Sequence, residues 1–201
     1  MSIQNSFPNR HLAEKILADA EHSNPGSWGS HSRICALCAE RIASKCGLDP
    51  HKAYVLGLLH DIGRKFGVRH LGHVYDGYLY MTELGFFDVA RVCLTHSFCV
   101  KSANCFVGKT DISAEEAIIL YKKLEETEYD EYDLLIQLCD CLAGADSILD
   151  MESRMLDVKN RYGVYPQDKW DKNMELKQHF EKLCGENIYR IVEIQLHNEG
   201  K

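Results

Sequence analysis

The chain has 201 residues, of which 45% are hydrophobic and 26% are charged, a composition typical of a soluble globular protein and unlike that of a disordered one. Its formal net charge is −7 and no stretch is strongly basic, which argues against broad binding to nucleic acid. No apolar run approaches the roughly 20 residues that cross a bilayer, and the first residues hold no basic segment followed by an apolar one, so we expect neither a membrane partner nor a secretory signal.

Helical periodicity runs along nearly the whole chain, and no segment alternates as a strand would. Capping residues support two of the boundaries: Asp49 and Pro50 begin one helix, and Ser113 with Glu116 makes a capping box for another. The expected fold class is therefore all-α, a single-domain helical bundle. Helices are predicted over residues 10–21, 30–45, 50 to the glycines at 63 and 67, 72–83, 88–95, 113–126, 131–150 with an extension to 159 left open, 169–183 and 187–197, with a long loop at 96–112 and a turn at 160–170.

The nine cysteines are an odd number, and without a secretory signal they predict free thiols in a reducing, cytoplasmic setting. Cys35 and Cys38, in "CALC", have the spacing of a zinc knuckle. No second pair completes a four-ligand site, and the two residues lie within a helical pattern, where a free cysteine behaves as a small hydrophobic residue. We therefore expect both to pack in the core.

Two polar residues stand side by side at the end of an apolar run, His60 and Asp61 in "LLHDIGRKFG". A buried carboxylate needs a charged partner or a metal to offset the loss of its hydration. Two cations, Arg64 and Lys65, follow within one turn. The rest of the chain should therefore supply the partners of this doublet.

Other polar residues lie on helical faces that are otherwise apolar. His31 heads a stripe that continues with Ile34 and Cys35, and Asp140 lies one turn after Ile136. Taken singly, a histidine in such a place is usually hydrogen-bonded in the core. A lone inward-facing aspartate is equally well explained by a buried salt bridge or a cap.

His73 and His96 occupy similar inward-facing positions on their own helices. Six buried polar side chains would each need their own hydrogen-bond or charge partner, whereas one shared metal site would serve all of them. Facing helices of a bundle build such sites. Imidazole and carboxylate donors suit zinc, manganese, iron, cobalt or nickel. The candidate ligands are His31, His60, Asp61, His73, His96 and Asp140.

This pattern resembles that of the HD-domain superfamily of metal-dependent phosphohydrolases: a histidine, a His-Asp doublet and a distant aspartate. The matching residues are His31 in "WGSHSRICALCAERIA", His60 and Asp61 in "LLHDIGRKFG", and Asp140 in "LLIQLCDCLAG". The resemblance covers residues 30–146, over half of the chain. It implies an HD metal-binding domain over residues 30–160, preceded by an N-terminal helix and loop (1–29) and followed by C-terminal helices (161–201) packed on the same domain.

Some branches of that superfamily carry two more histidines, which His73 and His96 match. In these features the chain is most similar to the bacterial branch that cleaves diadenosine tetraphosphate symmetrically, although it carries an extra stretch over residues 98–129. It lacks the Gly-Tyr-Pro motif of the cyclic-di-GMP phosphodiesterase branch, because "DGYLYM" has no proline. These differences leave the substrate open more than the metal site.

The resemblance implies two divalent ions, of Fe, Mn, Zn, Co, Ni or Mg, with Asp61 placed to bridge them. It implies hydrolysis of a phosphomonoester, phosphodiester or phosphoanhydride bond in a nucleotide or another small phosphorylated substrate. Arg64 and Lys65 are the candidate phosphate-binding residues beside Asp61. No Walker-type glycine loop is present. Further candidates of lower rank are His70 as a proton donor, Lys101 and Lys109 as phosphate contacts, and Arg154 and Arg161 in the pocket wall.

Two other functional classes stay open. One is a regulatory protein that binds metal and nucleotide without turnover, and the other is an HD-fold di-iron oxygenase. The oligomeric state is also open, with a homodimer among the expectations. Five histidines have no apolar stripe that places them with the cluster and are left outside the site: His11, His22, His51, His179 and His197.

Overall fold

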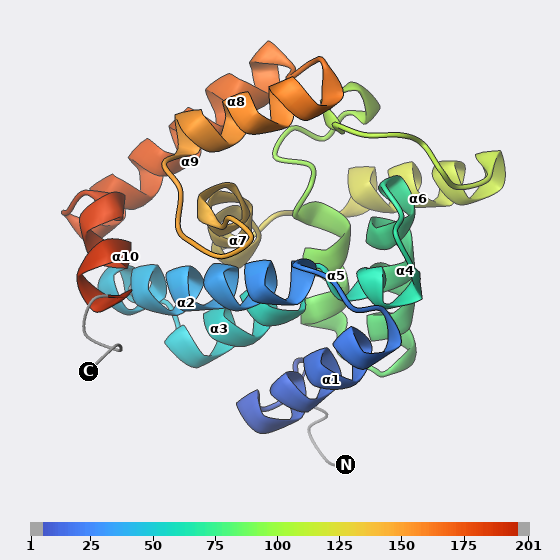
Figure 1. The fold of residues 1–201 in the computed structure, drawn as a ribbon, viewed down its shortest axis with the longest axis horizontal. Helices are drawn as coiled ribbons and strands as arrows, with labels where there is room; N and C mark the ends of the chain where they lie inside the picture. The colour runs from blue at the N-terminus through green and yellow to red at the C-terminus, as the bar shows by residue number, and fades with distance from the viewer. Residues whose placement is uncertain (1–5, 197–201) are drawn as a thin grey trace.

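The structure is a computed structural model, and it describes residues 6–196 (Figure 1). Within this range it is all-α, as predicted, with no sheet beyond an isolated bridge between Ala143 and Ile148. No helix in the described range is long and apolar enough to cross a membrane. The helices are α1 (Arg10–Ser23), α2 (Trp28–Cys46), α3 (Pro50–Leu59), η1 (Ile62–Phe66), α4 (Leu71–Glu83), α5 (Phe87–Thr95), η2 (Ala103–Cys105), α6 (Ala114–Glu126), α7 (Glu131–Leu142), α8 (Met151–Tyr162), α9 (Gln167–Cys184) and α10 (Ile188–Leu196).

Helices α2 and α3 lie side by side at the centre of the molecule, with α7 packed across them (Figure 1). α2 buries one apolar stripe, which includes Cys35 and Cys38, so the predicted core packing of the "CALC" pair is confirmed. In contrast, α3 is buried nearly all round. Gly57 allows the close approach, because a Cβ there would lie 2.9 Å from the Cα of Ala36 in α2.

The segment that carries the His-Asp doublet lies at the end of α3. The α-helix stops at Leu59, and a 3₁₀ turn, η1, takes the place of its predicted last turn. Gly63 of η1 lies against α4 so closely that a Cβ would meet the carbonyl oxygen of His73 at 1.9 Å. This contact fixes the doublet against the helix that carries His73.

The prediction of one helix over residues 131–150 is wrong, as is its extension to 159. α7 ends at Leu142, and the chain closes a tight turn in which the N–H of Gly144 donates to the carbonyl of Ser147 at 2.8 Å. The N–H of Leu149 donates back to the carbonyl of Leu142, also at 2.8 Å. Asp150 then begins α8 as its N-cap, accepting from the N–H of Ser153. These local bonds break the helix that the apolar periodicity suggested.

The region after this break also differs from the prediction. The predicted turn over residues 160–170 is shorter, because α8 runs to Tyr162 and α9 begins at Gln167. The predicted loop over residues 96–112, which precedes the break, is confirmed, since it is largely irregular and contains only the short η2. α9 and α10 pack on the central helices, and Arg41 of α2 donates to the carbonyl of Val192 at 3.1 Å. The division into residues 1–29, 30–160 and 161–201 stays a prediction.

Candidate metal centre

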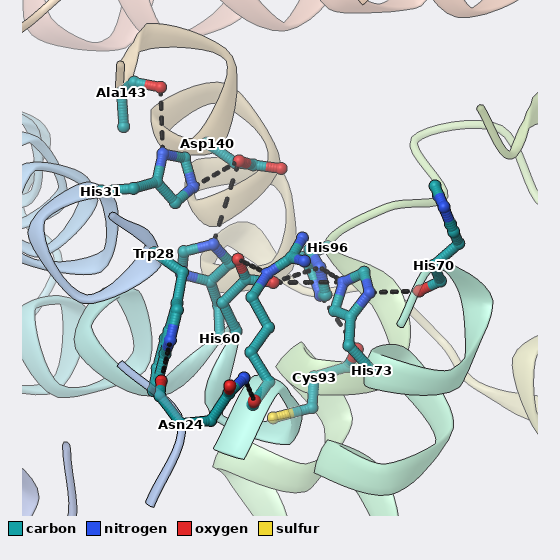
Figure 2. Close-up of polar contacts among 12 residues, drawn as sticks. Asn24, Trp28, His31, His60, His70, His73, Cys93, His96, Asp140 and Ala143 are labelled. Atoms are coloured by element: carbon teal, nitrogen blue, oxygen red, sulfur yellow. Dashed lines mark hydrogen bonds and ion pairs between the residues drawn. The ribbon is translucent and has the colours of Figure 1, made fainter. Parts of the chain in front are cut away.

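Three of the predicted ligands meet where α2, α3 and α7 converge. The Nε2 of His31 lies 3.0 Å from Oδ1 of Asp140, and the Nε2 of His60 lies 3.9 Å from the same oxygen. Figure 2 shows His31 and His60 both turned toward Asp140. We call these three residues the first ligand group. One donor atom from each lies within 4.8 Å of the others, close enough for all three to bind one ion.

The other three predicted ligands meet beside them, where η1, α4 and α5 come together. Asp61 places Oδ1 at 3.1 Å from Nε2 of His73 and at 3.6 Å from Nε2 of His96. These residues form the second ligand group, and their donor atoms also lie within 4.8 Å of one another. The two groups adjoin, since the rings of His60 and His96 have centroids 5.1 Å apart. The structure thus brings all six predicted ligands together.

Every histidine in the two groups is held by a backbone carbonyl at its Nδ1. A histidine that donates from Nδ1 presents the lone pair of Nε2, which is the arrangement that protein ligands of metals commonly have. In each case Nε2 faces the centre of the site (Figure 2). The carbonyl partners are Ala143 for His31 at 3.1 Å, Gly57 for His60 at 2.7 Å, His70 for His73, and Cys93 for His96 at 2.9 Å.

The donor atoms of this site fit a divalent metal. The Nε2 of His60 and the Oδ1 of Asp61 are buried and have no hydrogen-bond partner among the described residues. The Nε2 atoms of His73 and His96 face each other at 3.2 Å. Lone pairs that converge in this way repel unless a cation lies between them. The all-nitrogen-and-oxygen donor set suits zinc, manganese, iron, cobalt or nickel.

The electrostatics favour the metal-binding forms of Asp61, His96 and Asp140, whereas the hydrogen bond to Asp140 outweighs burial and raises the pKa of His31. Burial raises the pKa of Asp61, but the charges of Arg64 and His73 outweigh burial and hold it well below its ordinary value. Burial together with the neighbouring His60 lowers the pKa of His96 to about 3. The pKa of Asp140 is also lowered, because the hydrogen bond from His31 outweighs burial. Deprotonated carboxylates and neutral imidazoles are the ligating states.

Of the two predicted phosphate-binding cations, only Arg64 lies at the site. Its Nε donates to Oδ2 of Asp61 at 2.5 Å, and its carbonyl accepts from the side chain of Asn24 at 2.6 Å. The ammonium of Lys65 points elsewhere and lies over the ring of Tyr80, 4.0 Å from its centroid. Lys65 does not line the cavity described next, and its substrate contact stays a prediction.

A cavity of about 580 Å³ opens over the two ligand groups, and all the ligands except His60 line it. Its opposite wall, which we call the roof, consists of the lining residues between Leu149 and Lys169, mainly from α8. His70 lines the cavity too, with its ring 5.8 Å from that of Tyr162. The lining cations are Arg64, Arg69, Arg154, Arg161 and Lys169, and the larger apolar or aromatic lining residues include Trp28, Phe106, Val107, Tyr162 and Tyr165.

The remaining candidate residues differ in whether they line the cavity. Arg154, Arg161 and His70 line it, although a surface position was the favoured expectation for each, whereas Lys101 and Lys109 do not. The ammonium of Lys101 is bonded to the carbonyl of Thr127 instead. The histidines that were left out of the site, His11, His22, His51 and His179, do not line the cavity either, and His197 lies outside the described residues.

Sequence reasoning missed several lining residues, above all Arg69 and Lys169. Arg69 forms an ion pair with Asp76 at 2.6 Å, and Lys169 donates to the carbonyl of Ser97 at 2.8 Å. Neither residue interrupts an apolar stripe, which is the signal that revealed the ligands. Only the packing of α9 against the residue after His96 brings Lys169 to the site.

A buried polar network supports His96 from behind. Asp133 accepts from the hydroxyl of Thr95 at 2.7 Å, and the side chain of Gln137 donates to the carbonyl of Thr95 at 3.1 Å. Arg91 lies 3.2 Å from the carboxylate of Asp133. This network ties the end of α5 to α7 and so fixes the backbone that presents His96. Burial raises the pKa of Asp133 to about 6, even with these donors present.

The chain was compared with protein-family models, with curated proteins and with solved structures. The curated proteins and the solved structures gave no significant match. The family model for the HD domain matches residues 28–145, more than half of the chain. Both ligand groups fall inside the matched range, whereas the roof lies beyond it. The chain therefore belongs to the HD-domain family, most of whose members are metal-dependent hydrolases.

Proposed function

We propose that this protein is a metal-dependent phosphohydrolase that acts on a small phosphorylated substrate, and that the substrate is a nucleotide. The observation that carries the proposal is the pairing of two adjoining ligand groups with a cavity lined by five cationic side chains. A site of carboxylates and imidazoles faces arginine and lysine across a space large enough for a small molecule. That combination suits an anionic substrate that meets a metal centre.

The metal would be held by His31, His60 and Asp140 in one group and by Asp61, His73 and His96 in the other. Divalent ions at such a site act as Lewis acids toward phosphoryl oxygens and make hydroxide available at neutral pH. The adjoining positions of the groups support the proposal of two ions with Asp61 between them. The buried network at Thr95 and the carbonyls behind each Nδ1 keep the ligands in place.

Arg64 would orient the phosphate. Its Nε is engaged by Asp61, which leaves the Nη donors of its planar guanidinium for a phosphate oxygen. His70, which lines the cavity, would give a proton to the leaving oxygen. Its backbone is held on both sides, by the N–H bond to Asp111 at 2.6 Å and by the carbonyl bond to His73.

The nucleotide part of the proposal rests on the aromatic and apolar surface beyond the ligand groups. Phe106, Tyr162 and Trp28 line the cavity along with the cations, and a nucleobase can stack on such rings. Diadenosine tetraphosphate, the substrate of the branch that the motif resembles, belongs in the substrate panel for this reason. The free thiols of all nine cysteines fit the proposal of a reducing cytoplasm.

The cavity charges fit more than one of the alternatives. Arg154, Arg161 and Lys169 suit an anionic substrate, as the proposed hydrolase requires, but an oxygenase acting on an anionic compound could use them too. A regulatory protein would use the same cations for binding alone. Turnover therefore decides between the hydrolase and the regulatory protein, and oxygen consumption with bound iron would identify the oxygenase.

The test is phosphate release from a panel of phosphomonoesters, nucleotides and dinucleoside polyphosphates, with protein loaded separately with Mn, Fe, Co, Ni, Zn or Mg. We expect release with at least one ion, its loss on chelation, and its loss in a His60→Ala variant. His179→Ala, which changes a histidine outside the cavity, is the matched control and should keep full activity. Metal binding without release from any member of the panel would contradict hydrolysis.

A further inference from the structure

The cavity has walls of two different origins. The ligand groups and Arg64 lie inside the segment that matches the HD family, and the roof lies after it. In Figure 1, α8 crosses the top of the molecule above α7, the helix that carries Asp140. The roof therefore lies outside the matched family segment, and its side chains face the part of the cavity beyond the ligand groups.

The roof has more cationic side chains than carboxylates to pair with them. Its cations are Arg154, Arg161 and Lys169, and Asp157 is its only carboxylate among the lining residues described. The Nη2 of Arg161 lies 2.9 Å from Oδ2 of Asp157, whereas the Nη1 of Arg154 lies 3.4 Å from the same oxygen. Two positive charges thus remain for one wall of the cavity.

Of the three roof cations, Arg154 has the longer contact with Asp157, and the ammonium of Lys169 has no contact with a carboxylate among the described residues. The Arg154 side chain is only 21% exposed, and its contact with Asp157 leaves most of its five N–H donors unused. The Lys169 ammonium donates to the neutral carbonyl of Ser97 and has no ion pair among the described residues. Partly buried cations of this kind are stabilised by an anion that enters the cavity.

Both cations share the cavity with the ligand groups. Arg154 and Lys169 line it together with His31 and Asp140, and the ammonium of Lys169 donates to the carbonyl of Ser97, the residue after His96. Cys141 lines the cavity directly after the ligand Asp140. An anion between Arg154 and Lys169 would therefore adjoin the metal centre without occupying it.

We propose that Arg154 and Lys169 bind a second phosphate group of the substrate, so that the enzyme selects compounds with two or more linked phosphates over phosphomonoesters. This inference rests on the proposed hydrolase function and names its substrate class. One phosphoryl group lies at the ligand groups with Arg64, and its neighbour along the chain of phosphates lies under the roof. The planar guanidinium of arginine can donate two parallel hydrogen bonds to such a group, and the ammonium of lysine adds a compact positive charge.

The test separates binding from turnover. Binding of methylenediphosphonate, which has two linked phosphonates and is not hydrolysed, is measured by calorimetry on metal-loaded protein, with methylphosphonate as the single-group probe. Arg154→Met and Lys169→Gln should each weaken the diphosphonate roughly 10- to 100-fold, as the loss of a charge-assisted bond predicts. Each should change the single phosphonate by less than about 3-fold.

Matched controls are Arg190→Met and Lys182→Gln, which change exposed cations on α10 and α9 outside the cavity. They should leave both affinities unchanged. Arg154→Lys, which keeps the charge, and thermal unfolding of each variant show whether a loss comes from misfolding. The kcat/KM ratio of a nucleoside diphosphate to its monophosphate should fall in the two cavity variants by the same 10- to 100-fold range.

Equal losses for both probes, or none for either, would overturn the inference. The proposed function fails separately, if wild-type protein releases phosphate from no compound of the panel. In that case selective loss of diphosphonate binding in Arg154→Met would still place a second phosphate under the roof of a binding protein.

Discussion

The two ligand groups and the roof face each other across one cavity, yet they are built in opposite ways. Asp61 and the four histidines are buried, Asp140 is partly exposed, and each histidine is tied to a backbone carbonyl. The roof cations stand partly in solvent, and Arg154 and Arg161 are joined to Asp157 by pairs within a single helix. Such exposed pairs contribute little to stability. The proposed function and the further inference thus assign metal chemistry and substrate choice to different parts of the chain, and four experiments test this division.

The largest effect should come from a ligand that both ions would share. Asp61→Ala removes the carboxylate of the second ligand group and leaves His73 and His96 without an anionic partner. We expect bound metal, measured by elemental mass spectrometry, to fall from about two equivalents per chain to one or none. Activity should fall by more than about 100-fold. The control is Asp19→Ala, which changes an exposed aspartate on α1. Unchanged metal content in Asp61→Ala would refute the ligand assignment.

The next effect concerns the cation nearest the ligands. Arg64→Ala should lower kcat/KM roughly 10- to 100-fold through the loss of a charge-assisted phosphate contact. Metal content should stay near that of wild type, because Arg64 is no ligand. Arg64→Lys should recover only part of the loss, since lysine lacks the planar fork. Full activity in Arg64→Ala would exclude Arg64 from substrate binding.

The rigidity of the two regions can be compared by the free energy of unfolding that is lost when one glycine in each is replaced by alanine. A Cβ at Gly63 would lie 1.9 Å from the carbonyl of His73, whereas one at Gly163 meets nothing within 4 Å. Gly63→Ala should therefore cost about 3 kcal/mol of unfolding free energy. Gly163→Ala should cost about 1 kcal/mol, from its positive φ of 80° alone. Urea unfolding measures both, and equal costs would show that the contact of η1 with α4 is looser than described.

The smallest effect is a pH dependence from the network behind His96. Because the pKa of Asp133 is raised from 3.8 to about 6, folding favours its protonated form. Its contribution to stability is full below pH 3.8 and is lost as the pH rises through about 6. Between pH 5 and 7, wild type should lose about 1 kcal/mol more unfolding free energy than Asp133→Asn. Parallel pH profiles of the two proteins would contradict the raised pKa.

How far the sequence predicted the molecule depends on the kind of signal. The six ligand candidates were found because each interrupts an apolar stripe, and the structure gathers all of them. Lys169 and Arg69 lie in polar surroundings, where one more cation carries no signal, and only tertiary packing brings them to the cavity. Lys65 was predicted with Arg64 because both follow the His-Asp doublet. Its ammonium lies over the ring of Tyr80 instead, and the local sequence does not reveal this contact.

The missed break between α7 and α8 has a similar cause. Residues 131–150 are apolar enough for a continuous helix, and a single glycine at 144 is tolerated in many helices. The break depends on bonds that close the turn from Leu142 to Leu149 and on the Asp150 cap. The carbonyl of Ala143 is freed from the helix by this turn and accepts from His31, a partner 112 residues away. Helical periodicity contains no information about such a partner.

That long-range bond bears on the order in which the two ligand groups lose their ions as the protein unfolds. The second ligand group comes from one continuous stretch, Asp61 to His96, and His73 and His96 are anchored by carbonyls three residues before them. The first group is complete only when α7 and the turn at Ala143 have docked on His31. Helix α7 also supports the second group, through the bonds of Asp133 and Gln137 to Thr95. The first group depends on α7 more directly, because Asp140 of α7 is one of its members. In a cobalt titration at rising denaturant, the first site should therefore be lost before the second.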